Sequence, residues 1–411
     1  MSLNIIREKV NADKLEIGMY VCELDRPWLE TPYPLQGFTI VSDKDINKLQ
    51  NICEFVYIDV KRTLENESNF SVRNESLAFS EKDKRHIHKV EYVDSRPMEE
   101  ELPKAKTNFT AFFESTESLI KTLKKGERLD LKKFRSSTKQ MIDSVIRNPD
   151  AALWLVRLKQ SDDYLYLHSL RCSVLAVAFG RQLGLTKVQL NNLAIGAALM
   201  DIGKLKLPKT LLNRPGKLSD EEFEMIQDHV RLSLEMIVAD DHESKAVMDM
   251  VLTHHERMNG KGYPNQLAGT DIPLFGRIAA IVDCYDAIST DRPYAKALAP
   301  AEAVKKLYEW KGIDFHPALV EVFIQALGIY PAGSLVELTT GQVGVVMSEY
   351  RTRRLRPKIM LILDNNKCLY DEFPTIDLFK EVRTEDGQAI NIQRSLEPGS
   401  HGINPGELLL G

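Results

Sequence analysis

The sequence predicts a mainly α-helical protein with a small α/β module at its N-terminus and a small β-rich extension at its C-terminus. Between about residues 107 and 330, apolar residues recur at spacings of three and four, as they do along one face of a helix. Outside that region, short runs of β-branched and aromatic residues are bounded by turn residues, a pattern typical of strands.

Residues 1–63 are predicted to form the N-terminal module, for which we expect a sensory or regulatory role. Its segments GMYVCEL and FVYIDV have the composition of strands, and SDKDINKLQNI between them has a capped helical pattern. Residues 64–106 are polar, with few large apolar residues, and are predicted to be a linker. His86 and His88 lie in this stretch and are interpreted as solvated, because nothing near them predicts a buried site.

The helical domain is predicted to span residues 107–330. Its segment YLYLHSLRCSVLAVAFGRQLGL carries two apolar stripes, which predicts a helix buried on several sides with His168 as a polar exception. Farther on, a Pro-Gly turn precedes Ser219 and Glu222, whose spacing is that of a capping box, and this box opens the segment that carries His229.

The C-terminal extension is predicted to span residues 331–411. Its segments AGSLVELTTGQVGVVMSEY and RPKIMLILDNN alternate β-forming and polar residues around glycine and asparagine turns. Such alternation is typical of strands with one buried face. We therefore expect a small β-structured unit there.

Composition and charge exclude some classes of function. With 411 residues, a net charge of −5 and a pI near 6.1, the chain lacks the basic balance of a protein that binds duplex nucleic acid. Its five cysteines are scattered without CxxC spacing, which argues against a disulfide framework or a cysteine-zinc site. No run of 18 apolar residues occurs, so neither a membrane span nor a membrane partner is predicted, and we expect a cytoplasmic protein.

Two aspartates stand at costly positions. Asp201 lies at the end of an apolar helical pattern, where the helix dipole is negative, and Gly203 follows as a stop. A local pair with Lys204 would offset that charge and is the alternative to a functional role. Asp283 lies inside the apolar segment RIAAIVDCYDAI, where an ionised carboxylate is costly unless it is paired or bound to a metal. For Asp286, one turn on, we favour capping or a hydrogen bond to a neighbouring helix.

The stretch THHERMNGKGYP, residues 253–264, places two histidines side by side. Neighbours on a helix point about 100° apart, so His254 and His255 converge only on something that lies between their directions. A metal cluster or a polyanion would meet that requirement, whereas the alternative is a polar helix end.

Six histidines and aspartates from several predicted helices of one region form the candidate site. Imidazole and carboxylate groups without thiolate suit iron or manganese, and a set of this size resembles a two-metal hydrolytic centre. The six are His168, Asp201, His229, His254, His255 and Asp283.

These residues lie in motifs that resemble the HD-GYP family, a branch of the HD phosphohydrolases that degrade cyclic dinucleotides, chiefly cyclic di-GMP. The resemblance covers about residues 140–330 and includes several separated motifs in family order. They are DIGK (201–204), QDHV with His229, HHER (254–257), GYP (262–264), IVDCYDAIS (281–289) and DRPY (291–294). The N-terminal module and the β-structured tail are similar to those that flank this domain in one bacterial subgroup.

The resemblance implies the roles of the site residues. All six would be ligands of two or three divalent ions, iron or manganese, and Asp201 would bridge the ions at the catalytic centre. Lys204 would contact the scissile phosphate as a point charge. His254 and His255 would bind different ions of one cluster, which answers the question that their adjacency raises.

The same resemblance implies a substrate-binding surface. Arg292 would contact the second phosphate, and Gly262, Tyr263 and Pro264 would form a loop near the substrate. Glycine and proline also fix backbone geometry, so the alternative role of this loop is to hold a turn.

Three positions depart from the family pattern. Met200 stands where the family has the histidine of its His-Asp pair, and a thioether is a poor ligand for iron or manganese. Asn259 stands where aspartate is usual, and Ala295 where a basic residue often follows the tyrosine of DRPY. The departure at Met200 is the most serious, because it removes a ligand from one ion.

The expected function is therefore that of a metal-dependent phosphodiesterase in bacterial signalling. It would hydrolyse cyclic di-GMP, or a related cyclic dinucleotide, to the linear product pGpG and onward to GMP. The alternative is a catalytically impaired receptor that binds the dinucleotide or other signalling proteins without hydrolysis.

Overall fold

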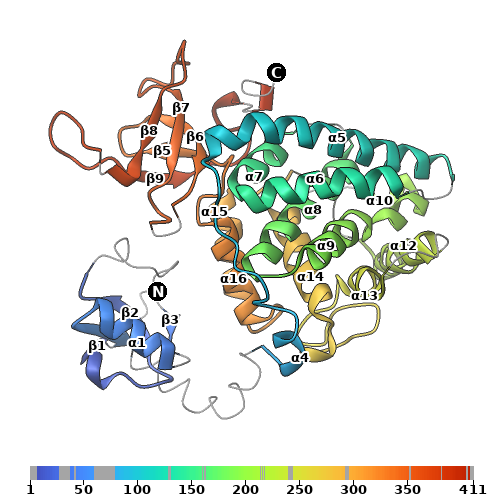
Figure 1. The fold of residues 1–411 in the computed structure, drawn as a ribbon, viewed down its shortest axis with the longest axis horizontal. Helices are drawn as coiled ribbons and strands as arrows, with labels where there is room; N and C mark the ends of the chain where they lie inside the picture. The colour runs from blue at the N-terminus through green and yellow to red at the C-terminus, as the bar shows by residue number, and fades with distance from the viewer. Residues whose placement is uncertain are drawn as a thin grey trace. The chain divides into compact units, whose positions relative to one another are not determined.

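The structure is a computed structural model that describes most of the 411-residue chain. It describes residues 7–26, 38–40, 43–59, 79–127, 131–159, 161, 163–212, 214, 216, 218–238, 244–291, 296–350, 353–380, 382–403 and 406–407. The chain divides into two compact units, which are considered separately (Figure 1). The first comprises Met1–Phe79 with Tyr350–Leu355, and the second comprises Ser80–Glu349 with Arg356–Gly411.

The first unit contains an antiparallel sheet and one helix. The strands follow the order β1-β4-β2-β3, and their bounds are β1 Arg7–Asn11, β2 Tyr20–Leu24, β3 Phe38–Thr39 and β4 Phe55–Asp59. Helix α1, Asp43–Ile52, carries Leu49 into a buried cluster with Val21 and Val56 of the sheet. This arrangement confirms the predicted α/β module.

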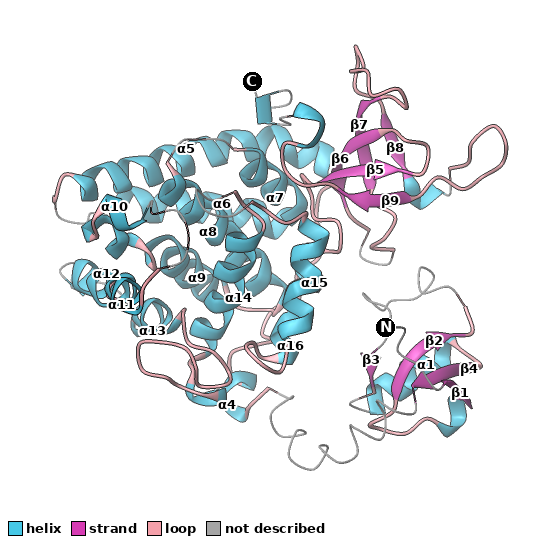
Figure 2. Ribbon diagram, turned by 180° about the vertical axis from the view of Figure 1, so that it is seen from behind, coloured by secondary structure: helices cyan, strands magenta, loops and turns pink. Residues whose placement is uncertain are grey.

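The second unit is mainly helical, as predicted, and Figure 2 shows its helices gathered in one body. The helices up to the centre of the unit are α4 Glu81–Lys84, α5 Met98–Lys124, α6 Lys132–Arg147, α7 Pro149–Leu158 and α8 Tyr164–Gln182. The later helices are α9 Lys187–Leu199, α10 Lys209–Leu212, α11 Asp220–Gln227, α12 His229–Val238, α13 Lys245–Thr253, α14 Leu274–Ile288, α15 Pro300–Trp310 and α16 Pro317–Leu327. Helix α8 packs against α7, α9, α14 and α16, so it is buried on several sides as its two apolar stripes predict.

The stretch predicted as a linker, 64–106, differs from the prediction in its second part. Residues 64–78 lie outside the described residues, whereas residues from Ser80 onward belong to the helical unit, and α5 crosses the predicted boundary at 106. A few widely spaced buried groups fix this segment despite its polar composition. They include Met98 and Ala105, together with a buried ion pair of 2.6 Å between Asp83 and Arg277. His86 and His88 themselves are exposed.

The β-rich extension is present as an antiparallel sheet. Its strands follow the order β8-β7-β6-β5-β9, with bounds β5 Leu335–Leu338, β6 Val343–Ser348, β7 Lys358–Leu363, β8 Thr375–Asp377 and β9 Ile392–Ser395. The sheet belongs to the same compact unit as the helices. One link is the hydrogen bond of 3.0 Å that the Glu349 N–H donates to Asp150 of α7.

Within the part of the chain that the structure describes, none of the helices combines the length and the apolar character that a bilayer span requires.

Candidate metal centre

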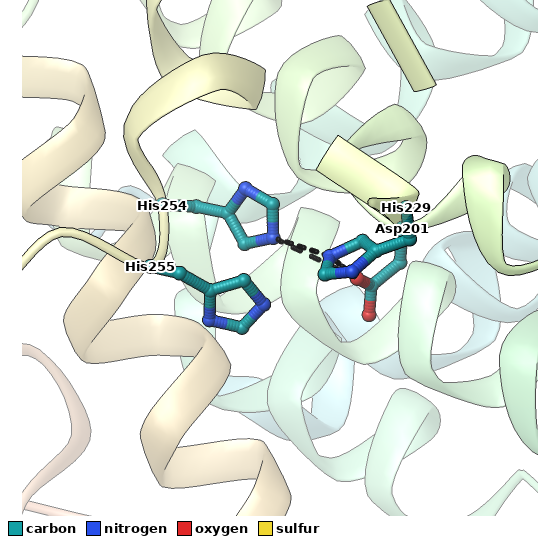
Figure 3. Close-up of side chains that lie close together, drawn as sticks. All are labelled: Asp201, His229, His254 and His255. Atoms are coloured by element: carbon teal, nitrogen blue, oxygen red, sulfur yellow. Dashed lines mark hydrogen bonds and ion pairs between the residues drawn. The ribbon is translucent and has the colours of Figure 1, made fainter. Parts of the chain in front are cut away.

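The structure brings all six candidate residues together inside the second unit. They come from α8 (His168), the end of α9 (Asp201), the start of α12 (His229), the end of α13 (His254 and His255) and α14 (Asp283). Five of the six are buried, and the His255 side chain is 13% exposed. Figure 3 shows how Asp201, His229, His254 and His255 point toward one another.

A glycine and a serine hold Asp201 against the start of α12. A Cβ at Gly203 would lie 2.1 Å from the carbonyl oxygen of His229, so only glycine permits this approach. The Gly203 N–H donates to Ser233 Oγ at 2.8 Å, and Ser233 Oγ donates to the Met200 carbonyl at 2.9 Å. The glycine that sequence analysis interprets as a helix stop therefore also positions the aspartate.

Two further glycines let α13 approach its neighbours closely. A Cβ at Gly276 of α14 would lie 1.9 Å from Thr253 Oγ1, and one at Gly196 of α9 would lie 2.4 Å from Met250 Sδ. Because α13 packs this tightly on both helices, the two histidines that follow it enter the same buried space as Asp201.

Hydrogen bonds to the backbone fix the proton positions on His229 and His254. Nδ1 of His229 lies 2.6 Å from the Ile226 carbonyl, and Nδ1 of His254 lies 2.7 Å from the Val251 carbonyl. A carbonyl only accepts, so each Nδ1 carries a proton and donates it. In the neutral imidazoles, each Nε2 is then left with an unprotonated lone pair.

Those two lone pairs converge on one oxygen. Nε2 of His229 lies 3.2 Å and Nε2 of His254 lies 3.6 Å from Asp201 Oδ1, and the two nitrogens are 3.3 Å apart (Figure 3). Oδ1 of Asp201 is buried without a hydrogen-bond partner among the described residues. Three acceptors facing one another without a proton repel, and a cation between them would remove that repulsion.

The second oxygen of Asp201 faces a different group of ligands. His168 Nε2 lies 3.0 Å from Asp201 Oδ2 and 3.4 Å from Asp283 Oδ1. His168 Nδ1 donates to Asp286 Oδ2 at 2.7 Å, so His168 Nε2 also presents a lone pair to the carboxylates. Asp201 is thus shared by two groups able to hold an ion, one with His168 and Asp283, the other with the three remaining histidines.

His255 reaches the cluster from just beyond the end of α13. Its Nδ1 lies 3.7 Å from Asp283 Oδ2, and its Nε2 is buried without a hydrogen-bond partner in the described part of the chain. Its ring centroid lies 4.1 Å from that of His254 and 4.5 Å from that of Tyr263, on which it stacks. Both histidines therefore lie in one group of potential ligands with Asp201 and His229, whereas the resemblance implies that they bind different ions.

The electrostatics leave the carboxylates ionised. Burial alone would raise the pKa of Asp201, but the positive charge of Lys204 outweighs it and holds the pKa well below its ordinary value. The pKa of Asp283 is likewise low, because its contacts with His168 and His255 outweigh burial. Ionised carboxylates are the form that a metal requires.

The same burial acts in the opposite direction on two of the imidazoles. It lowers the pKa of His255 well below the ordinary value, helped by neighbouring His254, and it also lowers the pKa of His229. The low pKa values keep these two rings neutral near pH 7, which is the protonation state of a metal ligand.

Comparison with known proteins assigns the chain to a family. Residues 154–319 match the family model of the HD domain, and residues 7–134 match a domain of unknown function (DUF3391). A cyclic di-GMP phosphodiesterase of Pseudomonas aeruginosa is 32% identical over 384 residues, which are 92% of this chain and 90% of that protein. The chain belongs to the HD-GYP family.

Other sequence relatives match a smaller share of the chain. The cyclic di-GMP phosphodiesterase response regulator RpfG of Xanthomonas campestris is 35% identical over 156 residues, which are 38% of this chain and 41% of that protein. A 3'3'-cGAMP-specific phosphodiesterase of Vibrio cholerae is 30% identical over 193 residues, which are 47% of this chain and 35% of that protein. Among solved structures, a protein of this type from Bdellovibrio bacteriovorus aligns over 77% of this chain and 98% of its own, with 15% identity and a TM-score of 0.46.

The HD-GYP loop lies against the histidine pair. A Cβ at Gly262 would lie 2.5 Å from each of three backbone atoms in residues 255–257, so the loop needs glycine there. Tyr263 stacks on His255, whereas Pro264 is exposed. Asn259, where HD-GYP proteins usually have aspartate, donates to Asp314 at 2.8 Å and holds the loop.

Sequence analysis did not identify Glu256 as important for this loop. Its side chain is buried and accepts the N–H groups of Asn265 at 2.8 Å and Leu267 at 3.0 Å. The available signal in the sequence was a carboxylate that directly follows the histidine pair. Glu256, which directly follows the two histidines, therefore holds the backbone of Asn265 and Leu267, just beyond the GYP segment, close to the cluster.

The remaining predicted positions lie beside the cluster or outside the described residues. Lys204 Nζ lies 2.7 Å from Asp201 Oδ2, the local pair that sequence analysis kept as an alternative, and its side chain is 25% exposed. Asp286 accepts a hydrogen bond from His168 of α8, which is the contact with a neighbouring helix that the sequence predicts. Asp286 also pairs with Arg171 of the same helix, a contact that was not predicted. Met200 is fully buried, whereas the predicted substrate contact Arg292 lies outside the described residues.

Proposed function

We propose that this HD-GYP chain is a metal-dependent phosphodiesterase that hydrolyses cyclic di-GMP to linear pGpG and onward to GMP. The observation that carries the proposal is the sharing of Asp201 between two groups of potential ligands, Oδ2 toward His168 and Oδ1 toward His229 and His254. A bridging carboxylate of this kind is typical of two-metal hydrolytic sites.

The donor set fits divalent ions. His168, Asp201 and Asp283 would hold one ion, and Asp201 with His229, His254 and His255 would hold another. Imidazole and carboxylate ligands without thiolate favour iron or manganese, in two or three positions. When bound, such ions polarise a phosphoryl oxygen and lower the pKa of water.

The chain itself supplies charge and shape for the substrate. Lys204 is positive and partly exposed beside Asp201, so its ammonium group would meet the scissile phosphate, and Arg292 would meet the second phosphate. Gly262 and Pro264 hold Tyr263 against His255. The Phe223 ring lies edge-on to the Tyr263 ring, with 5.9 Å between the ring centroids, and Phe223 is 46% exposed. This aromatic surface, which runs outward from the cluster, would stack a nucleobase.

The sequences of relatives support this substrate class. The Pseudomonas aeruginosa relative that spans 92% of the chain is named a cyclic di-GMP phosphodiesterase, and a relative named for 3'3'-cGAMP matches 47% of the chain. We therefore infer a cyclic dinucleotide, with cyclic di-GMP as the substrate. The first unit would have a regulatory role in the same chain, through signals or signalling partners.

A second candidate function rests on Met200. A chain short of one histidine ligand would bind the dinucleotide as a receptor without opening it. The ligand positions other than Met200 favour the enzyme, because buried polar groups that serve no purpose are costly to keep.

Product analysis on the full chain separates the two functions. The chain, loaded with manganese or with ferrous iron under anaerobic conditions, is incubated with cyclic di-GMP, and pGpG and GMP are measured by chromatography. Lys204→Ala is expected to weaken binding or turnover by about 1–3 kcal/mol. Lys206→Ala, which removes an exposed cation from the same short helix, is the matched control and leaves both unchanged.

Linear product from the parent chain, reduced in Lys204→Ala alone, supports the enzyme. Binding of cyclic di-GMP without any linear product supports the receptor. A metal-loaded chain that neither binds nor cleaves cyclic di-GMP contradicts both functions.

A further inference from the structure

A cavity of about 500 Å³ lies in the second unit, outside the group of candidate metal ligands. It is bounded by α7, α8 and α14 and by segments of the C-terminal extension around β5, residues 396–403 and Gly406. None of the six candidate metal ligands lines it, and its walls are mainly apolar, with Leu153, Leu335 and Leu396 among them. Its charged wall residues are Arg157, Arg171, Asp286 and Asp291, and a cavity of this size that combines apolar walls with polar groups is typical of small-molecule sites.

A guanidinium group with spare hydrogen-bonding capacity lines this cavity. Arg157 of α7 donates from Nη2 to the Tyr285 hydroxyl at 2.9 Å, and among the described residues no carboxylate forms an ion pair with it. A guanidinium carries five N–H donors, so several remain for another partner. The charge is half-buried against apolar walls, where an anion would stabilise it.

A second polar group in the cavity also has no partner. Ser334, immediately before β5, is 1% exposed, and its Oγ forms no hydrogen bond with any described residue. A buried hydroxyl without a partner carries a desolvation cost that a ligand oxygen would remove. The unsatisfied hydroxyl is therefore independent evidence for a ligand at this place.

We propose that this cavity binds a small amphipathic carboxylate, such as a medium-chain fatty acid. The carboxylate would accept hydrogen bonds from Arg157 and Ser334, which line the polar part of the wall. The apolar body would lie against Leu153, Leu335 and Leu396.

The cavity also shares two wall residues with the support of the metal cluster. Arg171 and Asp286 line it, Arg171 pairs with Asp286, and Asp286 Oδ2 accepts the Nδ1–H of His168. A carboxylate held by Arg157 adds a negative charge to a cavity whose wall contains the pair of Arg171 with Asp286, which changes how Asp286 holds His168. Binding in the cavity therefore changes the metal affinity of the group that contains His168, and linkage requires the reciprocal effect.

The binding test uses decanoate as the probe and decanol as an uncharged control of the same length. Calorimetry on the full chain is expected to show saturable binding of decanoate and binding of decanol at least about tenfold weaker, since the charge-assisted hydrogen bonds are lost. Arg157→Met keeps the apolar stem and removes the charge, so its affinity for decanoate falls to that for decanol. Lys159→Met, a cation at the end of α7 that does not line the cavity, keeps the parent affinity.

Two further variants keep the proposal testable if one of them folds poorly. Leu396→Trp fills the cavity and is expected to bind neither probe, whereas Ser334→Ala removes a hydroxyl without a partner, keeps the melting temperature and binds decanoate more weakly. No saturable binding of decanoate to the parent, or equal binding to parent and Leu396→Trp, overturns the site.

The coupling is tested by titrating manganese into the chain with and without decanoate. The manganese affinity of the parent is expected to change by about fivefold or more. That of Leu396→Trp is expected not to change. An identical manganese affinity with and without bound decanoate in the parent overturns the link between the cavity and the cluster, and this result is independent of any activity on cyclic dinucleotides.

Discussion

Nδ1 of His168 lies 2.7 Å from Oδ2 of Asp286, and this contact holds the imidazole proton on the side away from the cluster. The pKa of Asp286 is well below its ordinary value, because Arg171 and the hydrogen bond from His168 outweigh burial, so the carboxylate is ionised and accepts. Nε2 of His168 is then free to face Asp201 and Asp283. Asp286 thus acts on the site by positioning a proposed ligand.

Changing Asp286 to asparagine is expected to weaken the binding of one ion more than that of the other. The amide can present N–H to His168, which favours the wrong tautomer, and a loss of about 10–100-fold in metal affinity is typical for such a partner. Manganese calorimetry would show the loss in one class of site. Asp249→Asn, which removes a carboxylate paired with Lys245 on α13, is the control and leaves both classes unchanged.

Alanine at Asp201 is expected to affect both ions, whereas alanine at Asp283 affects mainly one. The reason is that the two oxygens of Asp201 face separate groups, while Asp283 belongs to the group with His168. Metal content per chain, measured by mass spectrometry on proteins with a parent-like helical spectrum, distinguishes the two variants. An unchanged metal content in Asp201→Ala would count against the whole cluster.

The fold class was predictable from helical spacing, and the approach of the six candidate residues to one another was predictable from the set as a whole and from the family motifs, although each residue is a weak signal alone. Helical spacing places His168, and the cost of a carboxylate in an apolar helix singles out Asp283. The sequence did not predict that α4 and the start of α5 are packed helices and not part of a linker. Their anchors are separated pairs such as Asp83 with Arg277, and no local pattern reveals that such residues meet. Glu256 was missed for a similar reason, since its partners are backbone groups about ten residues farther on.

Changing Glu256 to glutamine is expected to loosen the HD-GYP loop. One of its two acceptor oxygens is replaced by a donor facing a backbone N–H, which costs about 1–3 kcal/mol in a buried place. Amide hydrogen exchange of residues 258–268 would rise, while that of α8 stays as in the parent. Equal protection of the loop in both proteins would show that Glu256 does not hold it.

The buried pair of Glu101 with Arg147 is expected to make stability depend on pH. Burial would raise the pKa of Glu101, but Arg147 and Ser144 outweigh it and hold the pKa below its ordinary value of 4.5. A carboxyl whose pKa falls on folding contributes stability above its ordinary value and loses it as the pH falls through the folded value. The free energy of unfolding of the parent should therefore exceed that of Glu101→Gln by about 1–3 kcal/mol near pH 7. This difference should shrink as the pH falls into the acid range.

Urea unfolding of the parent and Glu101→Gln at a series of pH values measures this difference. Because Glu101 lies on α5, far along the chain from the candidate ligands, its effect on stability can be measured without added metal. A difference that stays constant from neutral pH into acid would contradict the assignment to this carboxyl.

Changing Met200 to histidine tests whether the cluster lacks a ligand. Met200 is fully buried at the end of α9 and directly precedes Asp201, so an imidazole there would enter the cluster region as a nitrogen ligand. The parent should hold one ion weakly and need a high concentration of free metal, whereas Met200→His should need less. Met200→Leu, close in volume but without a ligand atom, is the control and should behave as the parent.

The measurement is metal content and pGpG formation across manganese and ferrous-iron titrations of all three proteins. A Met200→His protein that melts at a lower temperature, binds no additional ion and forms no more product would mean that Met200 serves core packing and would favour the receptor.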